Sequence, residues 1–487
     1  MKKSLIVQVV LCFYFAAGAQ PISLCRDNPH YFFYNGKPTV LITSAEHYGA
    51  VINSTPEYKK YFDVLQQHHF NLTRIFTGSY LESNYYQDAP DSARKLNWEE
   101  EQNTLSVRPG KLIAPWARSN VQGYINSGNK FDLDRWDAQY FLRLRDFCRE
   151  ASSRGIVVEI VLFSANYSPS NWMNSPLNQQ NNVNQTEDVP YNQVYLSSYK
   201  KLAAYQLTMV SKIVDELNPF DNVYYEICNE PYWLKGIPEV DPSVHEQQVT
   251  PEIYKWQHAI AVRITQTEQK LPKKHLIAQN FANTYMKVEN MDNVVSILNF
   301  HYAYPPKTVT DNLSLNKPIS FDETNEGLNT AEKRKEAWAF MMAGGAVYNN
   351  LDWSFANDDM TGMGLNTSGR KRIGTDVWDQ LEVLQKAMAD YSFIKATPLD
   401  TTYKISGIDL YGLGIKGKDY MMYCVKSKGG YPKIWNCSLP RGKYLIKWID
   451  PSNGEITQRK IVKSANDSAE ITVPTFDKDQ VLRIKRL

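Results

Sequence analysis

Eight short runs of β-branched and aromatic residues recur along the chain. They cover residues 40–43, 72–76, 156–163, 223–228, 276–279, 294–300, 319–321 and 346–353. Helical patterns of apolar residues separate several of these runs, most clearly over 136–153 and 197–217. Strands that alternate with helices are typical of βαβ units and a parallel sheet. Eight such units predict an α/β fold of the (β/α)8 TIM barrel type.

The ends of the chain carry other patterns. Asn35-Gly36, between strand-like residues 31–34 and 39–43, predicts a hairpin. From about residue 398, short alternating segments, the first over 403–405, predict a small antiparallel β-sandwich. We therefore expect a barrel domain with an N-terminal hairpin over residues 20–397 and a sandwich domain over 398–487.

The first nineteen residues resemble a signal peptide. Lys2 and Lys3 precede an apolar run over 5–17, which ends in the small residues Ala17-Gly18-Ala19. The run is shorter than the ~20 residues that cross a bilayer, and no later stretch replaces it. We expect a secreted or periplasmic protein without a membrane span.

Composition excludes several other classes. The formal charge of +2 is spread along the chain without a basic stripe, so nucleic acid is not an expected partner. The cysteines show no metal-ligand or disulfide spacing, and we expect free thiols, with a Cys424–Cys437 bridge as the alternative. We expect a monomer that needs no cofactor or metal. The 31 Tyr and 11 Trp suit clefts for amphipathic ligands, although core packing explains most of them.

The strand-like run 223–228 ends in Asn229-Glu230-Pro231. Parallel α/β barrels place catalytic groups at the carboxyl ends of their strands, so Glu230 is a candidate catalytic acid. The alternative is a surface turn in which Glu230 caps a helix. Glu226 shares the parity of Glu230, so we expect it inside the barrel with Arg74 as its partner.

A second carboxylate is expected on a facing strand end, and residues 317–327 offer three acids. We select Glu323, which follows the apolar run, over Glu326 in the loop beyond. Asp322 has the opposite parity and is expected to point toward the helices. Two carboxyl groups across a barrel mouth suit glycosidic bond cleavage, and a structural ion pair is the alternative.

Two long connections, residues 78–129 and 164–192, fall on the same face and are expected to form walls of a cleft. Trp172 in the second offers either a stacking surface or an anchor for its loop.

Asn229-Glu230-Pro231 after the fourth strand and Glu323 after the seventh resemble the acid/base and nucleophile of the clan A glycoside hydrolases, which include the family-five cellulases. The resemblance spans residues 31–396. It implies a retaining mechanism in which Glu230 is protonated near neutral pH and Glu323 is ionised. Thr324-Asn325 departs from the aromatic residue and glycine that many family-five members carry there, which leaves the family within the clan open.

The resemblance also implies substrate-binding roles at other strand ends. The residues concerned are His47, Arg74, Asn229, His301, Tyr302 and Trp353. Arg74 would hold the nucleophile ionised, Asn229 would bind the sugar 2-hydroxyl and Trp353 would form a platform under the sugar. Core packing or an ion pair is the alternative for most of them, and His47 is evenly balanced.

The sequence thus predicts an exported retaining β-glycoside hydrolase that acts on poly- or oligosaccharides. The alternatives are a non-catalytic carbohydrate-binding protein on the same fold and a transglycosylase that uses the same carboxylates. The sugar, the linkage and endo or exo action remain open.

Overall fold

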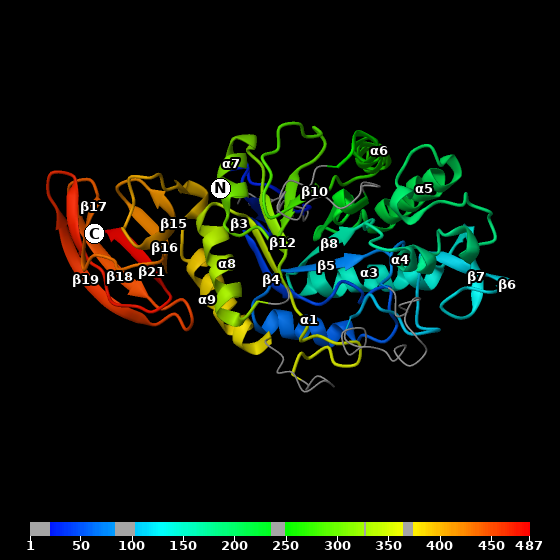
Figure 1. The fold of residues 1–487 in the computed structure, drawn as a ribbon, viewed down its shortest axis with the longest axis horizontal. Coiled ribbons are helices and arrows are strands. Elements are labelled where there is room, and N and C mark those ends of the chain that lie inside the picture. The colour runs from blue at the N-terminus through cyan, green and yellow to red at the C-terminus, as the bar shows by residue number, and fades with distance from the viewer. Residues whose placement is uncertain (1–19, 83–102, 235–248, 326–327, 364–373) are drawn as a thin grey trace, which may run out of the picture.

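The computed structural model describes residues 20–82, 103–234, 249–325, 328–363 and 374–487 (Figure 1). The expected signal peptide and Glu326 lie outside this part of the chain. At the N-terminal side, β1 (Ser23–Leu24), β2 (Phe32–Tyr34) and β3 (Lys37–Thr39) form a small antiparallel sheet. Asn35 and Gly36 join β2 to β3 with φ of 48° and 74°, the left-handed pair that a tight hairpin turn requires.

Eight parallel strands form the barrel, as predicted. They are β4 (Leu41–Ala45), β5 (Leu72–Phe76), β8 (Val157–Val161), β9 (Val223–Glu226), β10 (Ile277–Asn283), β11 (Ile297–His301), β12 (Ile319–Glu323) and β13 (Val347–Leu351). Their order in the sheet is β4-β13-β12-β11-β10-β9-β8-β5. Between β4 and β5 the side chain of Asn71 closes the ring. Its Oδ1 accepts from the Ile42 amide at 2.8 Å and its Nδ2 donates to the Val40 carbonyl at 2.8 Å.

Helices follow the strands around the outside of the barrel. They are α1 (Tyr58–Gln67), α3 (Ala138–Ser153), α5 (Lys200–Leu217), α6 (Pro251–Glu268), α7 (Lys307–Asn312), α8 (Thr330–Met342) and α9 (Gly374–Ala389), with short η4 (Pro231–Leu234), η5 (Leu313–Leu315) and η6 (Phe393–Lys395) turns. Within the described residues, no helix is both long and apolar enough to cross a membrane.

The two long connections carry structure of their own. The first contains β6 (Trp116–Gln122) and leads into β7 (Asn129–Trp136), which pairs with it as a hairpin. The second contains α4 (Pro169–Asn174), η2 (Gln179–Asn181) and η3 (Tyr191–Gln193). Trp172 is buried and its Nε1 donates to the Val189 carbonyl at 2.8 Å, so this ring anchors its loop.

The C-terminal strands form two antiparallel sheets, as predicted. The six-stranded sheet is ordered β14-β15-β16-β21-β18-β19, and a second sheet pairs β17 with β20. The strands are β14 (Thr397–Pro398), β15 (Ile408–Ile415), β16 (Asp419–Lys426), β17 (Ile434–Ser438), β18 (Gly442–Ile449), β19 (Ile456–Ser464), β20 (Ser468–Thr472) and β21 (Asp479–Arg486). The expected domain boundary at residue 398 stays a prediction.

One expected strand is wrong. Residues 403–405 form no strand, and Ile405 makes only an isolated bridge with Ile408. The carboxylate of Asp400 accepts from the Thr402 amide at 2.9 Å and from its hydroxyl at 2.6 Å, which bends the chain before a strand can begin.

Helices α8 and α9 lie between the barrel and the C-terminal sheets (Figure 1). Arg334 on α8 donates two hydrogen bonds to Asp479 on β21, at 2.8 and 2.7 Å, and both side chains are buried. Trp338 on α8 stacks on Tyr423 at 5.7 Å between ring centroids. Because α8 follows β12, these contacts join the C-terminal sheets to the helix beside Glu323.

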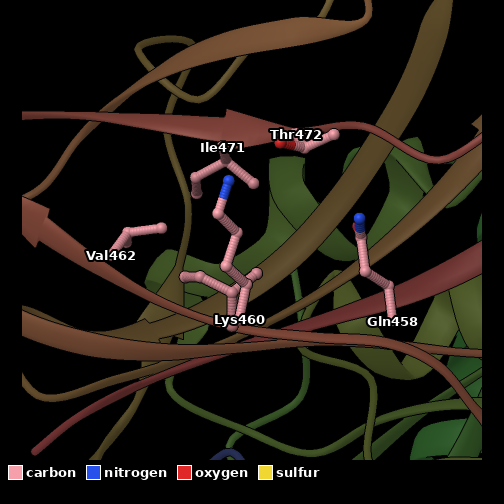
Figure 2. A pocket seen from close by; sticks show the side chains of 6 residues that line it. Gln458, Lys460, Val462, Ile471 and Thr472 are labelled. Carbon is pink, nitrogen blue, oxygen red and sulfur yellow. The ribbon is translucent and has the colours of Figure 1, made fainter.

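Cys25, Cys148, Cys228, Cys424 and Cys437 are buried and unpaired, as expected. A shallow pocket lies in the C-terminal sheets, lined by Ile446, Gln458, Lys460, Val462, Ile471 and Thr472 (Figure 2). Its lining lacks an aromatic ring, so it offers no platform for stacking a sugar.

Candidate functional site

Most of the predicted site residues come together at the carboxyl ends of the barrel strands. They are Arg74 on β5, Asn229 and Glu230 just after β9, His301 and Tyr302 at the end of β11, and Glu323 at the end of β12. Glu230, Tyr302 and Tyr48 adopt positive φ angles of 48°, 51° and 63°. Such conformations cost roughly 1–3 kcal/mol each and cluster at functional sites, because the surrounding structure must enforce them.

The two predicted catalytic carboxylates face each other across His301. One oxygen of Glu230, one oxygen of Glu323 and a ring nitrogen of His301 all lie within 4.8 Å of one another. His301 Nδ1 lies 3.0 Å from Glu230 Oε1 and 3.5 Å from Glu323 Oε1. The imidazole therefore separates two carboxylates that would otherwise repel each other at close range.

Glu323 is held by two donors. Arg74 Nη1 donates to its Oε2 at 3.2 Å, and the Tyr302 hydroxyl donates to its Oε1 at 2.9 Å. The side chain keeps 12% of its surface exposed, unlike the acids deeper in the barrel. Glu323 is thus held by one donor on each of its oxygens.

Arg74 links the nucleophile candidate to the acids beneath it. Its Nη2 donates to Glu226 at 2.5 Å and to Asn229 Oδ1 at 2.8 Å, and its Nε donates to Glu226 at 3.1 Å. The guanidinium is fully buried and also lies over the Tyr48 ring at 4.7 Å. The structure thus places Arg74 against both Glu226 and Glu323. Burial raises the pKa of Glu226 to about 7, against the charge of Arg74.

Glu230 is bound on both of its oxygens. The Tyr167 hydroxyl donates to Oε2 at 2.7 Å, and the Asn229 amide donates to the same hydroxyl at 2.8 Å. The Tyr232 hydroxyl lies 3.5 Å from Oε1. The sequence reasoning missed both tyrosines. Tyr232 lies two residues after Glu230, and this closeness in sequence could have indicated it as a neighbour of the acid. Tyr167 lies in a long connection, where no sequence spacing relates it to Glu230.

The charges and hydrogen bonds of the site shift the pKa of His301 and the pKa of Glu230 in opposite directions. Burial lowers the pKa of His301, but the charges of Glu323 and Asp322 outweigh burial and hold it well above its ordinary value. Burial raises the pKa of Glu230, but the hydrogen bonds from His301 and Tyr167 outweigh burial and bring it below its ordinary value. The direction of the Glu230 shift runs against the expectation that Glu230 itself is protonated near neutral pH, and that expectation stays a prediction. The two groups titrate as a pair that shares one proton.

Asp322 points into the barrel, and the expectation from strand parity is wrong. In the pairing of β11 with β12, Phe300 lies opposite Phe321 and His301 lies opposite Glu323, so Asp322 is an extra residue in a β-bulge. A bulge changes the alternation of side chains along its strand. Asp322 is fully buried, with Oδ2 3.5 Å from Arg74 Nη2.

Beneath the site, Glu159 on β8 is another fully buried acid that the sequence reasoning did not select. Its Oε1 accepts from Asn299 Nδ2 at 2.7 Å. Burial and the charges of Asp322 and Glu226 raise its pKa well above the ordinary value. Its Oε2 lies 3.8 Å from Arg74 Nε, and the charge of Arg74 opposes this rise.

His47 and Trp353 form a separate pair at the ends of β4 and β13. Their rings meet edge to face with centroids 4.4 Å apart, and His47 Nε2 lies 3.3 Å from Glu82 Oε1. Trp353 is half-buried. Glu46, which precedes His47, is fully buried and accepts from the amides of Gly49 and Ala50. It fixes the loop that presents His47.

The acids and His301 lie close enough for metal ligation, but their contacts fit hydrogen bonding better. Arg74 already lies 2.5 Å from Glu226 and 3.5 Å from Asp322, and a protonated His301 offers no lone pair. A cation would have to displace or repel both positive groups.

No protein-family model matches the sequence, and no curated protein matches it either. Solved structures do match. One is a putative glycoside hydrolase from Bacteroides vulgatus, with a TM-score of 0.63, 13% identity and coverage of 96% of this chain and 83% of that one. Another, a glycoside hydrolase family 5 structure from the same organism, has a TM-score of 0.60, 11% identity and coverage of 96% and 92%. A third, described as a glycoside hydrolase, has a TM-score of 0.60, 10% identity and coverage of 96% and 97%. Over nearly its whole length, the chain thus has the fold of clan A glycoside hydrolase structures.

Proposed function

We propose that the protein is an exported retaining β-glycoside hydrolase that cleaves poly- or oligosaccharides. The observation that carries this proposal is the pair of carboxylates, Glu230 and Glu323, with oxygens within 4.8 Å of each other at the barrel mouth. Retaining enzymes hold their carboxyl groups about 5–5.5 Å apart, while inverting enzymes need about 6.5–9.5 Å to admit a water molecule. The N-terminal sequence pattern supports export.

In the proposed first step, a Glu323 oxygen attacks the anomeric carbon while the glycosidic bond to the leaving oxygen breaks. Arg74 and Tyr302 orient the carboxylate, because Arg74 donates to Oε2 at 3.2 Å and Tyr302 donates to Oε1 at 2.9 Å. The leaving oxygen takes the proton that Glu230 and His301 share. In the second step, water attacks the same carbon, returns a proton to the pair and releases Glu323 as a carboxylate.

Glu230 defines the leaving-group side of the site. Tyr167 and Trp233 flank it, are 41% and 49% exposed, and meet edge to face at 6.5 Å between centroids. Exposed rings next to the acid suit a leaving group with an apolar face, such as a pyranose. Trp353 and His47 are proposed to contact the sugar on the other side of the bond.

The test separates the two carboxylates by azide rescue. We expect Glu323→Gly to abolish hydrolysis of aryl β-glycosides and to yield an α-glycosyl azide from an activated substrate. We expect Glu230→Ala to yield the β-azide, because azide then replaces water in the second step. If Glu323→Gly gave the β-azide and Glu230→Ala gave the α-azide, the two roles would be reversed. If Glu323→Gln were active and Glu326→Gln inactive, the nucleophile would be Glu326.

A panel of β-linked glucans, mannans, galactans and xylans identifies the substrate. Binding without turnover on every glycan would favour the non-catalytic alternative. Transfer to an added sugar acceptor in place of hydrolysis would favour a transglycosylase.

A further inference from the structure

Asp322 has contacts that the two-carboxylate mechanism does not use. Its Oδ2 accepts from Asn299 Nδ2 at 3.0 Å and lies 3.8 Å from His301 Nε2. The other ring nitrogen of His301 lies 3.0 Å from Glu230 Oε1. The imidazole thus stands between Asp322 on one side and Glu230 on the other, and both Asp322 and His301 are fully buried.

We propose that Asp322 is a positioning residue for the acid/base, and that it acts through His301, which exchanges a proton with Glu230. Asp322 holds the charge and the ring orientation of His301 through Nε2, and His301 shares the proton on Nδ1 with Glu230. The inference deepens the proposed function and rests on it, since this exchange serves the proton donated to the leaving group.

The position of Asp322 on the Nε2 side distinguishes it from the other acids around His301. Glu230 and Glu323 both contact Nδ1, at 3.0 and 3.5 Å. Among the described residues, the Nε2 atom has no hydrogen-bond partner. At 3.8 Å, Asp322 acts on it as an ion pair.

Other groups also face His301 and must be counted in its charge balance. They are Glu226 and Glu230 from β9 and its end, Glu323 and Asp322 from β12, Arg74 from β5, and the neighbouring Tyr302. The positive charge of Arg74 lowers the proton affinity of His301, and the negative charges of the carboxylates raise it. Asp322 contributes a charge that stays in place during the reaction, whereas Glu323 loses its charge when it bonds to the sugar.

The proton balance follows from this difference. In the proposed cycle, His301 Nδ1 starts with the shared proton, which passes to Glu230 and then to the leaving oxygen as Glu323 forms its bond to the anomeric carbon. Glu230 and His301 together can then accept one proton, which comes from the attacking water. Asp322 takes no proton in this scheme.

The test uses Asp322→Asn in the full-length protein. In the plot of kcat/KM against pH, the basic limb should shift to lower pH by about 1–3 units, as expected for loss of a charge near an ionised group. The loss of kcat/KM should be large for aryl β-glycosides with poor leaving groups and small for a dinitrophenyl glycoside, which needs no proton. Glu159→Gln is the matched control, since Glu159 is equally buried and also accepts from Asn299 Nδ2, and its profile should stay in place.

A purely structural role for Asp322 would lower kcat/KM equally for all leaving groups and leave the basic limb unmoved, and that result overturns the proposal. Histidine-labelled NMR gives a readout that does not require activity. The His301 ring should be an imidazolium at pH 7.5 in the parent protein and neutral in Asp322→Asn. If the parent protein is inactive but the NMR spectra differ in this way, the glycosidase proposal is refuted and the coupling of Asp322 to His301 stands. If His301 stays an imidazolium in Asp322→Asn, the coupling is refuted.

Discussion

Arg74→Lys tests how the barrel core prepares the nucleophile. The arginine reaches Glu226, Asn229 and Glu323 with three different nitrogen atoms. A lysine keeps the charge but has one nitrogen, which cannot span these acceptors. The most buried of them, Glu226, is expected to retain the lysine, so that the hydrogen bond to Glu323 at 3.2 Å is lost.

The magnitude follows from that one bond. A hydrogen bond to a charged group contributes about 1.5–3 kcal/mol. If this whole free energy stabilises the transition state, its loss lowers kcat/KM by roughly 10- to 150-fold at 25 °C. A dinitrophenyl β-glycoside is the appropriate substrate, because the first step then depends on Glu323 and not on proton donation.

Arg334→Lys is the control for loss of a buried, bidentate arginine elsewhere in the chain. Arg334 binds Asp479 across the interface with the C-terminal sheets, away from Glu323, so we expect lower stability with unchanged kcat/KM. Circular dichroism melting establishes that each variant is folded at the assay temperature. A folded Arg74→Lys variant with kcat/KM within threefold of the parent would refute the role assigned to Arg74.

Three further predictions concern other parts of the molecule. Trp233→Ala should lower kcat/KM by roughly 2- to 10-fold on oligosaccharides, because ring contacts with the leaving sugar are lost. A glycosyl fluoride lacks a sugar leaving group, so its kcat/KM should not change. Equal losses on both substrates would show that Trp233 does not contact the leaving group. Burial raises the pKa of Glu46 from 4.5 to about 7, so the stability tied to its protonated form is complete below pH 4.5 and is lost as pH rises through 7. Urea unfolding from pH 5 to 9 should show the parent losing about 3 kcal/mol relative to Glu46→Gln, and parallel curves would contradict a buried neutral acid. Arg334→Met leaves Asp479 buried without its cation and should cost about 3–5 kcal/mol in urea unfolding, whereas a loss below 1 kcal/mol would mean that water compensates Asp479.

The barrel was predictable because its signals are local. Eight β-branched runs with helical patterns between them lead to parallel strands in chain order, and the carboxyl ends of such strands share one face. That reasoning led to Glu230, Glu323 and Arg74 without any contact being known. The closure of the ring by Asn71 had no such signal, since it depends on the gap left between the first and second barrel strands.

Strand parity predicted Glu226 correctly and Asp322 wrongly, and the difference lies in the register between neighbouring strands. Along β9 no bulge intervenes before Glu226. Along β12 one extra residue enters opposite β11 and turns Asp322 inward. A bulge belongs to a pair of strands, so one strand's pattern of apolar residues does not reveal it.

The residue types and their order along the chain were enough to establish the barrel, the C-terminal sheets and the strand ends that carry acids. The packing of the strands against one another settled which acids enter the core, that Tyr167 binds Glu230, and that carboxylates surround His301. Secondary structure follows mainly from near neighbours in sequence. Proton affinity depends instead on burial and on charges from other strands, such as Asp322 and Glu323 beside His301, which meet only in the folded protein.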